Sequence, residues 1–95
     1  MTDQNIAQAV ELAPLIERVH GENHPELTRV RELTLALPAA DEARRAELFE
    51  KLRTVTANYA LPDDACEAFT GTYQALERAD REHAALAGSV TKTDR

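Results

Sequence analysis

Apolar residues recur through most of this chain at alternating steps of three and four, the spacing of one face of an α-helix. Prolines and glycines divide the pattern into four segments, which predict helices at about 3–20, 25–37, 40–58 and 61–88. No sustained two-residue alternation and no hairpin signal competes with this interpretation. The connections between the helices are short, which predicts antiparallel neighbours. We therefore expect an all-α fold, a short up-down-up-down four-helix bundle.

Each predicted helix carries one apolar face. In the first three helices the face consists of Ile6, Val10, Ala13, Ile16 and His20, then Leu27, Val30, Leu33 or Thr34, and Leu37, then Leu48, Phe49, Leu52 and Val55. In the last helix it consists of Cys66, Phe69, Tyr73, Leu76, Asp80, His83 and Ala87. Asp80 and His83 lie one turn apart on this face and are titratable, which makes them candidate metal ligands.

Proline and glycine predict how the helices begin and end. Pro14 lies inside the first helix and predicts a kink or a fresh start there. Gly21 follows the first helix, where a left-handed cap is expected. Pro25 suits the first position of the second helix, with His24 as its cap. Pro62 begins the fourth helix.

Length and charge limit the classes of protein. A chain of 95 residues forms one domain, which we place at 1–90 with a disordered tail at 91–95. The net charge of −6 argues against nucleic acid and anionic membranes as partners. No apolar run reaches the ~18 residues of a membrane span, and the first residues lack the pattern of a signal peptide. We expect a soluble cytoplasmic protein.

Two segments resemble a known family. The segment VHGENHPELTRVREL, at 19–33, and the segment LRTVTANYALPDDACEAFTGTYQALERADREH, at 52–83, resemble the hemerythrin-like domain of the iron-sulfur cluster repair di-iron proteins. The resemblance covers about half of the chain and implies a hemerythrin-like bundle, an iron cofactor and a part in the stress response.

The resemblance also implies a ligand set, of which this chain keeps little. Family members hold two irons with four His and two bridging Glu. His83 matches the ligand His of the fourth helix, but Ala87 stands where its Glu partner is expected. The other family ligands have no counterpart, so a complete di-iron centre inside one chain is not predicted.

The remaining histidines allow a reduced metal site. His20 and His24 are four residues apart, but the glycine and proline between the helices interrupt their face, so a structural role in the turn is the alternative. His20 and His24 are expected beside the start of the fourth helix. His83 lies ~20 residues after that start, which is ~30 Å along the helix at 1.5 Å per residue. The candidate ligands His83, Asp80, His20 and His24 therefore meet only if two chains pack antiparallel. The alternative for Asp80 is pairing with His83 or Arg81 in water.

The single Cys66 is expected to be buried and inert, and no arrangement of Cys and His for catalysis is indicated. An enzymatic activity is therefore not predicted. The second and third helices look too short to cover the fourth, which predicts an exposed apolar strip and hence a homodimer or a protein partner. The strip consists of Leu76, Ala79, Ala84 and Leu86.

Two functions from different classes follow. The first is a hemerythrin-like protein whose metal site is reduced, or is assembled only on dimerisation, and binds iron or another divalent metal. The second is a metal-free member of that family that serves as a helical protein-interaction or regulatory module.

Overall fold

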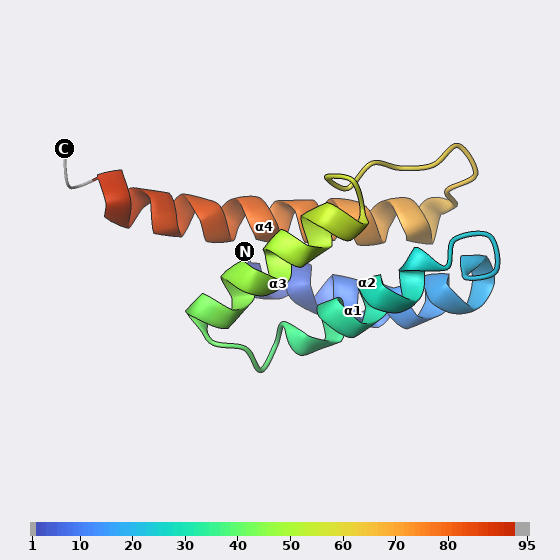
Figure 1. Ribbon diagram of the computed structural model, residues 1–95, viewed down its shortest axis with the longest axis horizontal. Coiled ribbons are helices and arrows are strands. Elements are labelled where there is room, and N and C mark those ends of the chain that lie inside the picture. The colour runs from blue at the N-terminus through green and yellow to red at the C-terminus, as the bar shows by residue number, and fades with distance from the viewer. Residues whose placement is uncertain (1, 93–95) are drawn as a thin grey trace.

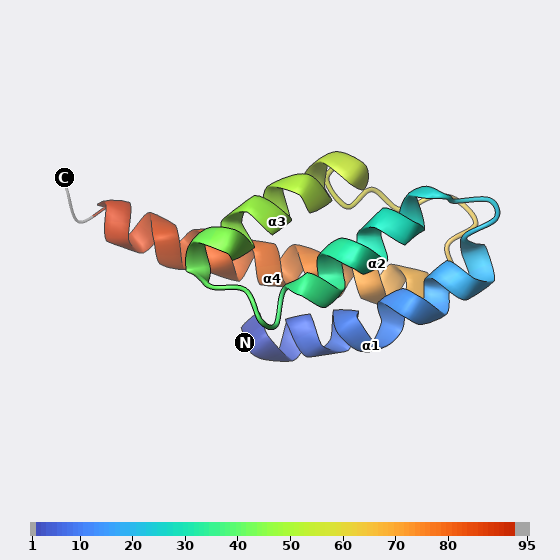
Figure 2. The same ribbon diagram turned by 60° about the horizontal axis from the view of Figure 1, so that its bottom comes forward.

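The structure is a computed structural model that describes the backbone of residues 2–92 and the side chains of 3–86. This part of the chain forms four α-helices and no strand: α1 (Thr2–His20), α2 (Glu26–Ala36), α3 (Glu42–Val55) and α4 (Glu67–Lys92). Figure 1 and Figure 2 show that successive helices run in opposite directions. The prediction of an all-α four-helix arrangement is confirmed.

The contact between α1 and α4 is the most extensive in the bundle. Small side chains make this contact close, because Ala9 and Ala13 on α1 and Ala75 and Ala79 on α4 are all buried. An Asn5 amide that donates to the Glu82 carboxylate at 3.2 Å adds a polar link between the two helices. α2 packs between α1 and α3, whereas α3 touches α4 only lightly. The bundle is therefore built on the α1–α4 pair.

The core is formed mainly by the apolar faces that the helical spacing predicts. The members buried as expected are Ile6, Ala13, Ile16, Leu27, Val30, Leu33, Thr34, Leu37, Leu48, Phe49, Leu52, Phe69, Tyr73 and Leu76. The exposed strip is smaller than expected, because Leu76 and Ala79 are buried beneath the other helices. Ala84 and Leu86 are exposed, as predicted. Among the described residues, no helix combines the length and the apolar character needed to cross a bilayer.

The start of the fourth helix was placed too early by sequence. α3 already ends at Val55 and α4 begins at Glu67, so an eleven-residue connection, 56–66, joins them. Pro62 begins a turn in which its carbonyl accepts the Ala65 N–H at 3.1 Å. The connection is long because α3 is short: the chain must run from the end of α3 to the distant start of α4 (Figure 1).

Other helix ends also differ from the sequence-based expectation. α1 is one helix through Pro14. Gly21 has no positive φ, so the expected left-handed cap is not formed. Glycine is needed there because the Glu17 carbonyl approaches so closely that a Cβ would collide with it. Pro25 occupies the cap of α2, and no side chain caps this helix.

The C-terminal end of α4 lies further along the chain than predicted. The helix runs to Lys92 instead of ending near Gly88. The predicted tail, 91–95, therefore begins inside α4. Residues 93–95 and the side chain at 87 lie outside the described residues.

The connection begins with an unusual left-handed turn. Ala57, Asn58 and Tyr59 have φ angles of 54°, 61° and 63°. The Asn58 N–H donates to the Arg53 carbonyl at 2.8 Å and the Ala57 N–H donates to the Thr54 carbonyl at 3.4 Å, the bonding pattern of a Schellman helix end. Glycine normally occupies the first left-handed position of this motif, because a Cβ costs free energy there. Three such residues in succession make the turn strained.

Replacing Ala57 with glycine should stabilise the protein. The Ala57→Gly variant loses the left-handed penalty, offset in part by the greater freedom of glycine in the unfolded chain, for a net gain of about 1 kcal/mol. Chemical denaturation measures the change. The matched control is Ala46→Gly on the exposed face of α3, which should cost about 1 kcal/mol because the helical backbone there needs no such freedom. If both substitutions destabilise the protein to the same extent, the backbone at Ala57 is not strained.

Candidate functional site

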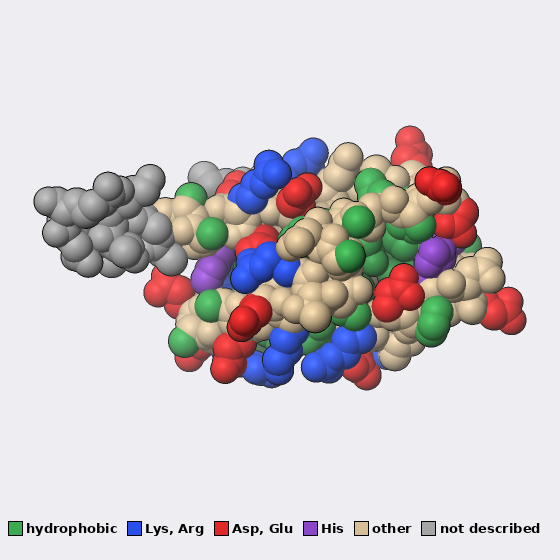
Figure 3. All heavy atoms as spheres, turned by 45° about the horizontal axis from the view of Figure 1, so that its top comes forward, with side chains coloured by type: hydrophobic (Ala, Val, Ile, Leu, Met, Phe, Trp, Pro, Cys, Tyr) green, Lys and Arg blue, Asp and Glu red, His purple; other side chains and the backbone are tan. Residues whose placement is uncertain are grey.

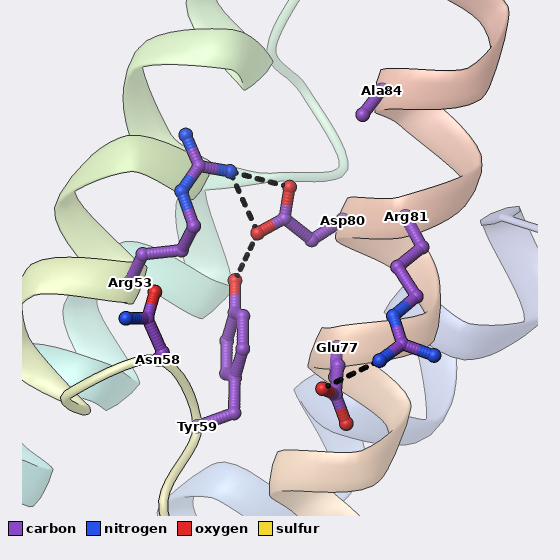
Figure 4. Close-up of a pocket in the computed structure, with 7 residues that line it drawn as sticks. All are labelled: Arg53, Asn58, Tyr59, Glu77, Asp80, Arg81 and Ala84. Atoms are coloured by element: carbon purple, nitrogen blue, oxygen red, sulfur yellow. Dashed lines mark hydrogen bonds and ion pairs between the residues drawn. The ribbon is translucent and has the colours of Figure 1, made fainter.

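Asp80, one of the candidate metal ligands, is buried in an ion-pair network. It is 6% exposed and lies on α4. The Arg53 Nη1 atom donates to its two carboxylate oxygens at 2.7 and 2.8 Å. The Tyr59 hydroxyl donates to Oδ2 at 2.7 Å. Figure 4 shows the three side chains converging from α3, the left-handed turn and α4.

The network leaves the Asp80 carboxylate little capacity for a metal ion. Both oxygens already accept hydrogen bonds, and the guanidinium of Arg53 supplies the positive charge that a cation would bring. Burial raises the pKa of Tyr59, and the hydrogen bond to Asp80 raises it further, so its hydroxyl remains a donor. The alternative pairing of Asp80 with His83 or Arg81 is wrong: Arg81 pairs with Glu77 at 3.2 Å, one turn away on α4. Both residues line a surface pocket of about 260 Å³ beside Asp80.

His83 is engaged separately from Asp80. Its Nε2 atom lies 3.2 Å from the Glu42 carbonyl, and since a carbonyl only accepts, that nitrogen carries the proton. Its ring packs against Phe49 with centroids 5.5 Å apart. These contacts hold His83 against the start of α3. The adjacent pair Asp80 and His83 is thus not assembled into one half-site.

The other two histidines lie at the opposite end of α4. His20, the last residue of α1, has its Nε2 atom 3.2 Å from Cys66 Sγ. The Phe69 N–H donates to the same sulfur at 3.5 Å. Cys66 is exposed, so the prediction of a buried thiol is wrong. The late start of α4 explains the error, because Cys66 precedes the helix and caps it. A pairing of Cys with His, which the sequence did not indicate, is present here.

His24 forms a second pair beside the first. Its Nε2 atom lies 3.0 Å from Asp64 Oδ1 and 3.1 Å from Oδ2. Its Nδ1 atom lies 3.3 Å from Glu26. The hydrogen bond with Asp64 is the main cause that raises the pKa of His24, and it lowers the pKa of Asp64. Both imidazole rings pack edge-on against Phe69, with centroids 5.2 Å away for His20 and 5.5 Å for His24.

We call the residues His20, His24, Asp64, Cys66 and Phe69 the imidazole cluster. It contains a thiol, two imidazoles and a carboxylate, which are all possible metal ligands. Nevertheless, residues 3–86 contain no group of three or more His, Cys, Asp or Glu arranged to hold a metal ion. The side chains present do not fit the di-iron centre that the resemblance implies, because Asp80 is already neutralised and Ala87 stands where the Glu partner of His83 is expected.

The partners of the titratable residues could not be predicted from the sequence. Arg53 and Tyr59 lie within the segment that carries the family resemblance, but no helical spacing links them to Asp80. One signal was present: an aspartate on a core-facing helical stripe requires a cation or several donors. Arg53, in the last turn of the preceding helix, is one of the cations that could have been considered for this role.

Comparisons with family models, with curated proteins and with solved structures found no match for this chain. The resemblance to the hemerythrin-like domain therefore rests on the two sequence segments alone.

Removing the Tyr59 hydroxyl should destabilise the fold. In the Tyr59→Phe variant Asp80 loses a buried hydrogen bond to a charged group, and we expect a loss of about 1–2 kcal/mol in the free energy of unfolding. Tyr73→Phe is the matched control: this buried tyrosine has no hydrogen-bond partner among the described residues and should tolerate the change. Equal effects of the two substitutions in denaturant titrations would show that the hydrogen bond from Tyr59 to Asp80 contributes no stability.

The pair of His24 and Asp64 should stabilise the fold only within a limited range of pH. A raised pKa at His24 gives a contribution that is complete below 6.5 and is lost as pH rises through the raised value. A lowered pKa at Asp64 gives a contribution that is complete above 3.8 and is lost as pH falls through the lowered value. The stability lost in His24→Gln should therefore be greatest between pH 3.8 and 6.5. A loss that stays constant up to pH 9 would contradict this pairing.

Proposed function

We propose that this protein is a helical interaction or regulatory module that binds its partner through the projecting end of α4. The end of α4 continues past the other three helices in both ribbon views (Figure 1, Figure 2). Its last described side chains are the consecutive Ala84, Ala85 and Leu86, all of which are exposed. Leu86, at 62%, is among the most exposed large apolar side chains of the described residues.

The observation that supports this proposal is the exposed apolar end of a helix that the bundle does not cover. A long helix in water is stabilised mainly by packing of its apolar face. Among the described side chains, Ala84, Ala85 and Leu86 at this end of α4 are exposed, so the other three helices do not cover them. A second copy of the chain, packed antiparallel against this end, is the first candidate partner. The two ends of such a symmetric contact cover each other.

Site-specific crosslinking tests the proposal. A photoreactive residue at position 86 should crosslink to one discrete protein in cells, and light scattering of the purified chain shows whether that protein is a second copy. The same residue at position 35, on the exposed Leu35 of α2, is the control. The Leu86→Glu variant should lose the complex, because it buries a charge in the contact. A monomeric chain that gives no discrete crosslink at position 86 would contradict the proposal.

A second candidate function is binding of a divalent metal, iron among others, between two chains of a dimer. The observation that favours it is the gathering of His20 and His24 at one end of α4, with ring centroids 6.4 Å apart, while His83 lies at the other end. An antiparallel dimer is the arrangement that brings His83 of one chain toward the imidazole cluster of the other. The resemblance to the iron-sulfur cluster repair family supports iron as the metal.

Elemental analysis tests the metal. Protein purified without an affinity tag should contain about two metal ions per dimer, one for each of the two equivalent sites, and His83→Ala should lose them while remaining dimeric. Glu42→Ala is the control, because His83 contacts only the backbone carbonyl of that residue. A dimer without metal that retains its stability in His83→Ala would exclude this function and leave the interaction module.

A further inference from the structure

A second surface pocket lies where the connection 56–66 passes over α2, α3 and α4. It has a volume of about 270 Å³ and is lined by Glu26, Val55, Thr56, Ala57, Ala60, Leu61, Pro62 and Tyr73. Most of this lining is apolar. Figure 3 shows hydrophobic side chains gathered in a hollow toward the right-hand end of the molecule, with acidic side chains at its margin.

Tyr73 presents an unused hydroxyl to this pocket. The residue is 3% exposed, its ring packs edge-on against Phe69 at 5.0 Å, and its hydroxyl has no hydrogen-bond partner among the described residues. Among those residues Thr34 Oγ1 is the one fully buried side-chain polar atom without a partner, so the Tyr73 hydroxyl still opens to the pocket. A phenol in an apolar wall costs free energy unless a partner reaches it. It therefore marks where a ligand's polar group would lie.

The polar groups of the pocket favour a positively charged ligand. Burial, with a smaller effect from the nearby Glu26 carboxylate, raises the pKa of Tyr73 to about 12, so the phenol is neutral and can accept as well as donate. The hydroxyl of Thr56 is already occupied, since it donates to the Leu52 carbonyl and accepts from the Tyr59 N–H. Glu26 thus supplies the one carboxylate of the lining.

The surroundings of Glu26 do not cancel this charge. His24, which lies 3.3 Å from Glu26, also pairs with Asp64, so one imidazolium stands between two carboxylates. The group keeps a net negative charge at neutral pH even when His24 is protonated. The chain as a whole carries −6. A cation that approaches the pocket is therefore attracted.

We propose that this pocket binds an alkylammonium group, as carried by a lysine side chain or a free aliphatic amine. The carbon chain lies on the apolar lining formed by the connection. The ammonium, which has three donors and no acceptor, donates to the Tyr73 hydroxyl and to the Glu26 carboxylate. This site is separate from the projecting end of α4, so its test does not depend on the proposed interaction module.

Nuclear magnetic resonance of the full chain tests the proposal with n-pentylammonium as the probe. The amide signals of residues 55–61 should shift in a saturable manner at millimolar probe. The uncharged n-pentanol, of the same chain length, should bind more weakly. Nα-acetyl-lysine amide, whose side-chain ammonium is free, and 1,5-diaminopentane, titrated next, distinguish a lysine side chain from a free amine by whichever binds more tightly. Shifts that are equal for pentylammonium and pentanol, or scattered over the whole chain, would overturn the proposal.

Two substitutions with matched controls locate the ammonium. Glu26→Gln should weaken pentylammonium binding by about threefold to tenfold. Glu32→Gln, which removes an equal charge from the exposed face of the same helix, should leave the affinity nearly unchanged. Tyr73→Phe should weaken binding about threefold without loss of stability, because its hydroxyl has no partner to lose. Equal affinities in Glu26→Gln and Glu32→Gln would refute the assigned position of the ammonium.

Discussion

The buried carboxylate of Asp80 is the constraint on which the second half of the fold depends. A charge in the interior of a helical bundle is unfavourable unless it is paired and hydrogen-bonded. Here Arg53 and Tyr59 meet both requirements, and they come from different elements of the chain. α3 itself touches α4 only lightly, and these polar contacts, together with those of His83 to Phe49 and to the Glu42 carbonyl, join α3 and the following turn to α4. They also fix the left-handed turn, which forms one wall of the pocket lined by Glu26 and Tyr73.

The helical faces could be predicted from sequence because they depend on local spacing. Apolar residues that recur every three or four positions lie on one face of a helix, and that face is buried. Examples are Leu27, Val30, Leu37 and Leu52. The side-chain partnerships could not be predicted, because they join residues far apart along the chain. Arg53 and Asp80 are 27 positions apart, and His20 and Cys66 are 46 positions apart. Periodicity within one helix contains no information about which faces of two helices meet.

The errors at helix ends had consequences for the candidate site. Pro62 is compatible with both a helix start and a turn, and the choice between them decides the environment of Cys66. A helix from Pro62 would have placed the thiol on a buried face. With α4 starting at Glu67, the thiol instead lies outside the helix and beside an imidazole. The chemistry of the imidazole cluster therefore depends on a shift of five residues in the start of α4, from Pro62 to Glu67. Helix ends are the positions that sequence patterns predict least well.

The left-handed turn at Ala57, Asn58 and Tyr59 has a consequence for the order in which the protein folds. Three non-glycine residues in this conformation are unfavourable in an isolated chain, so local sequence cannot form the turn early. The Tyr59 hydroxyl finds its acceptor only when α4 has docked. We therefore expect this turn to form late, when α4 docks on the bundle. Any process that pulls α4 away from α3 should release it first, which makes the amide protons of this segment the natural reporters of partial opening.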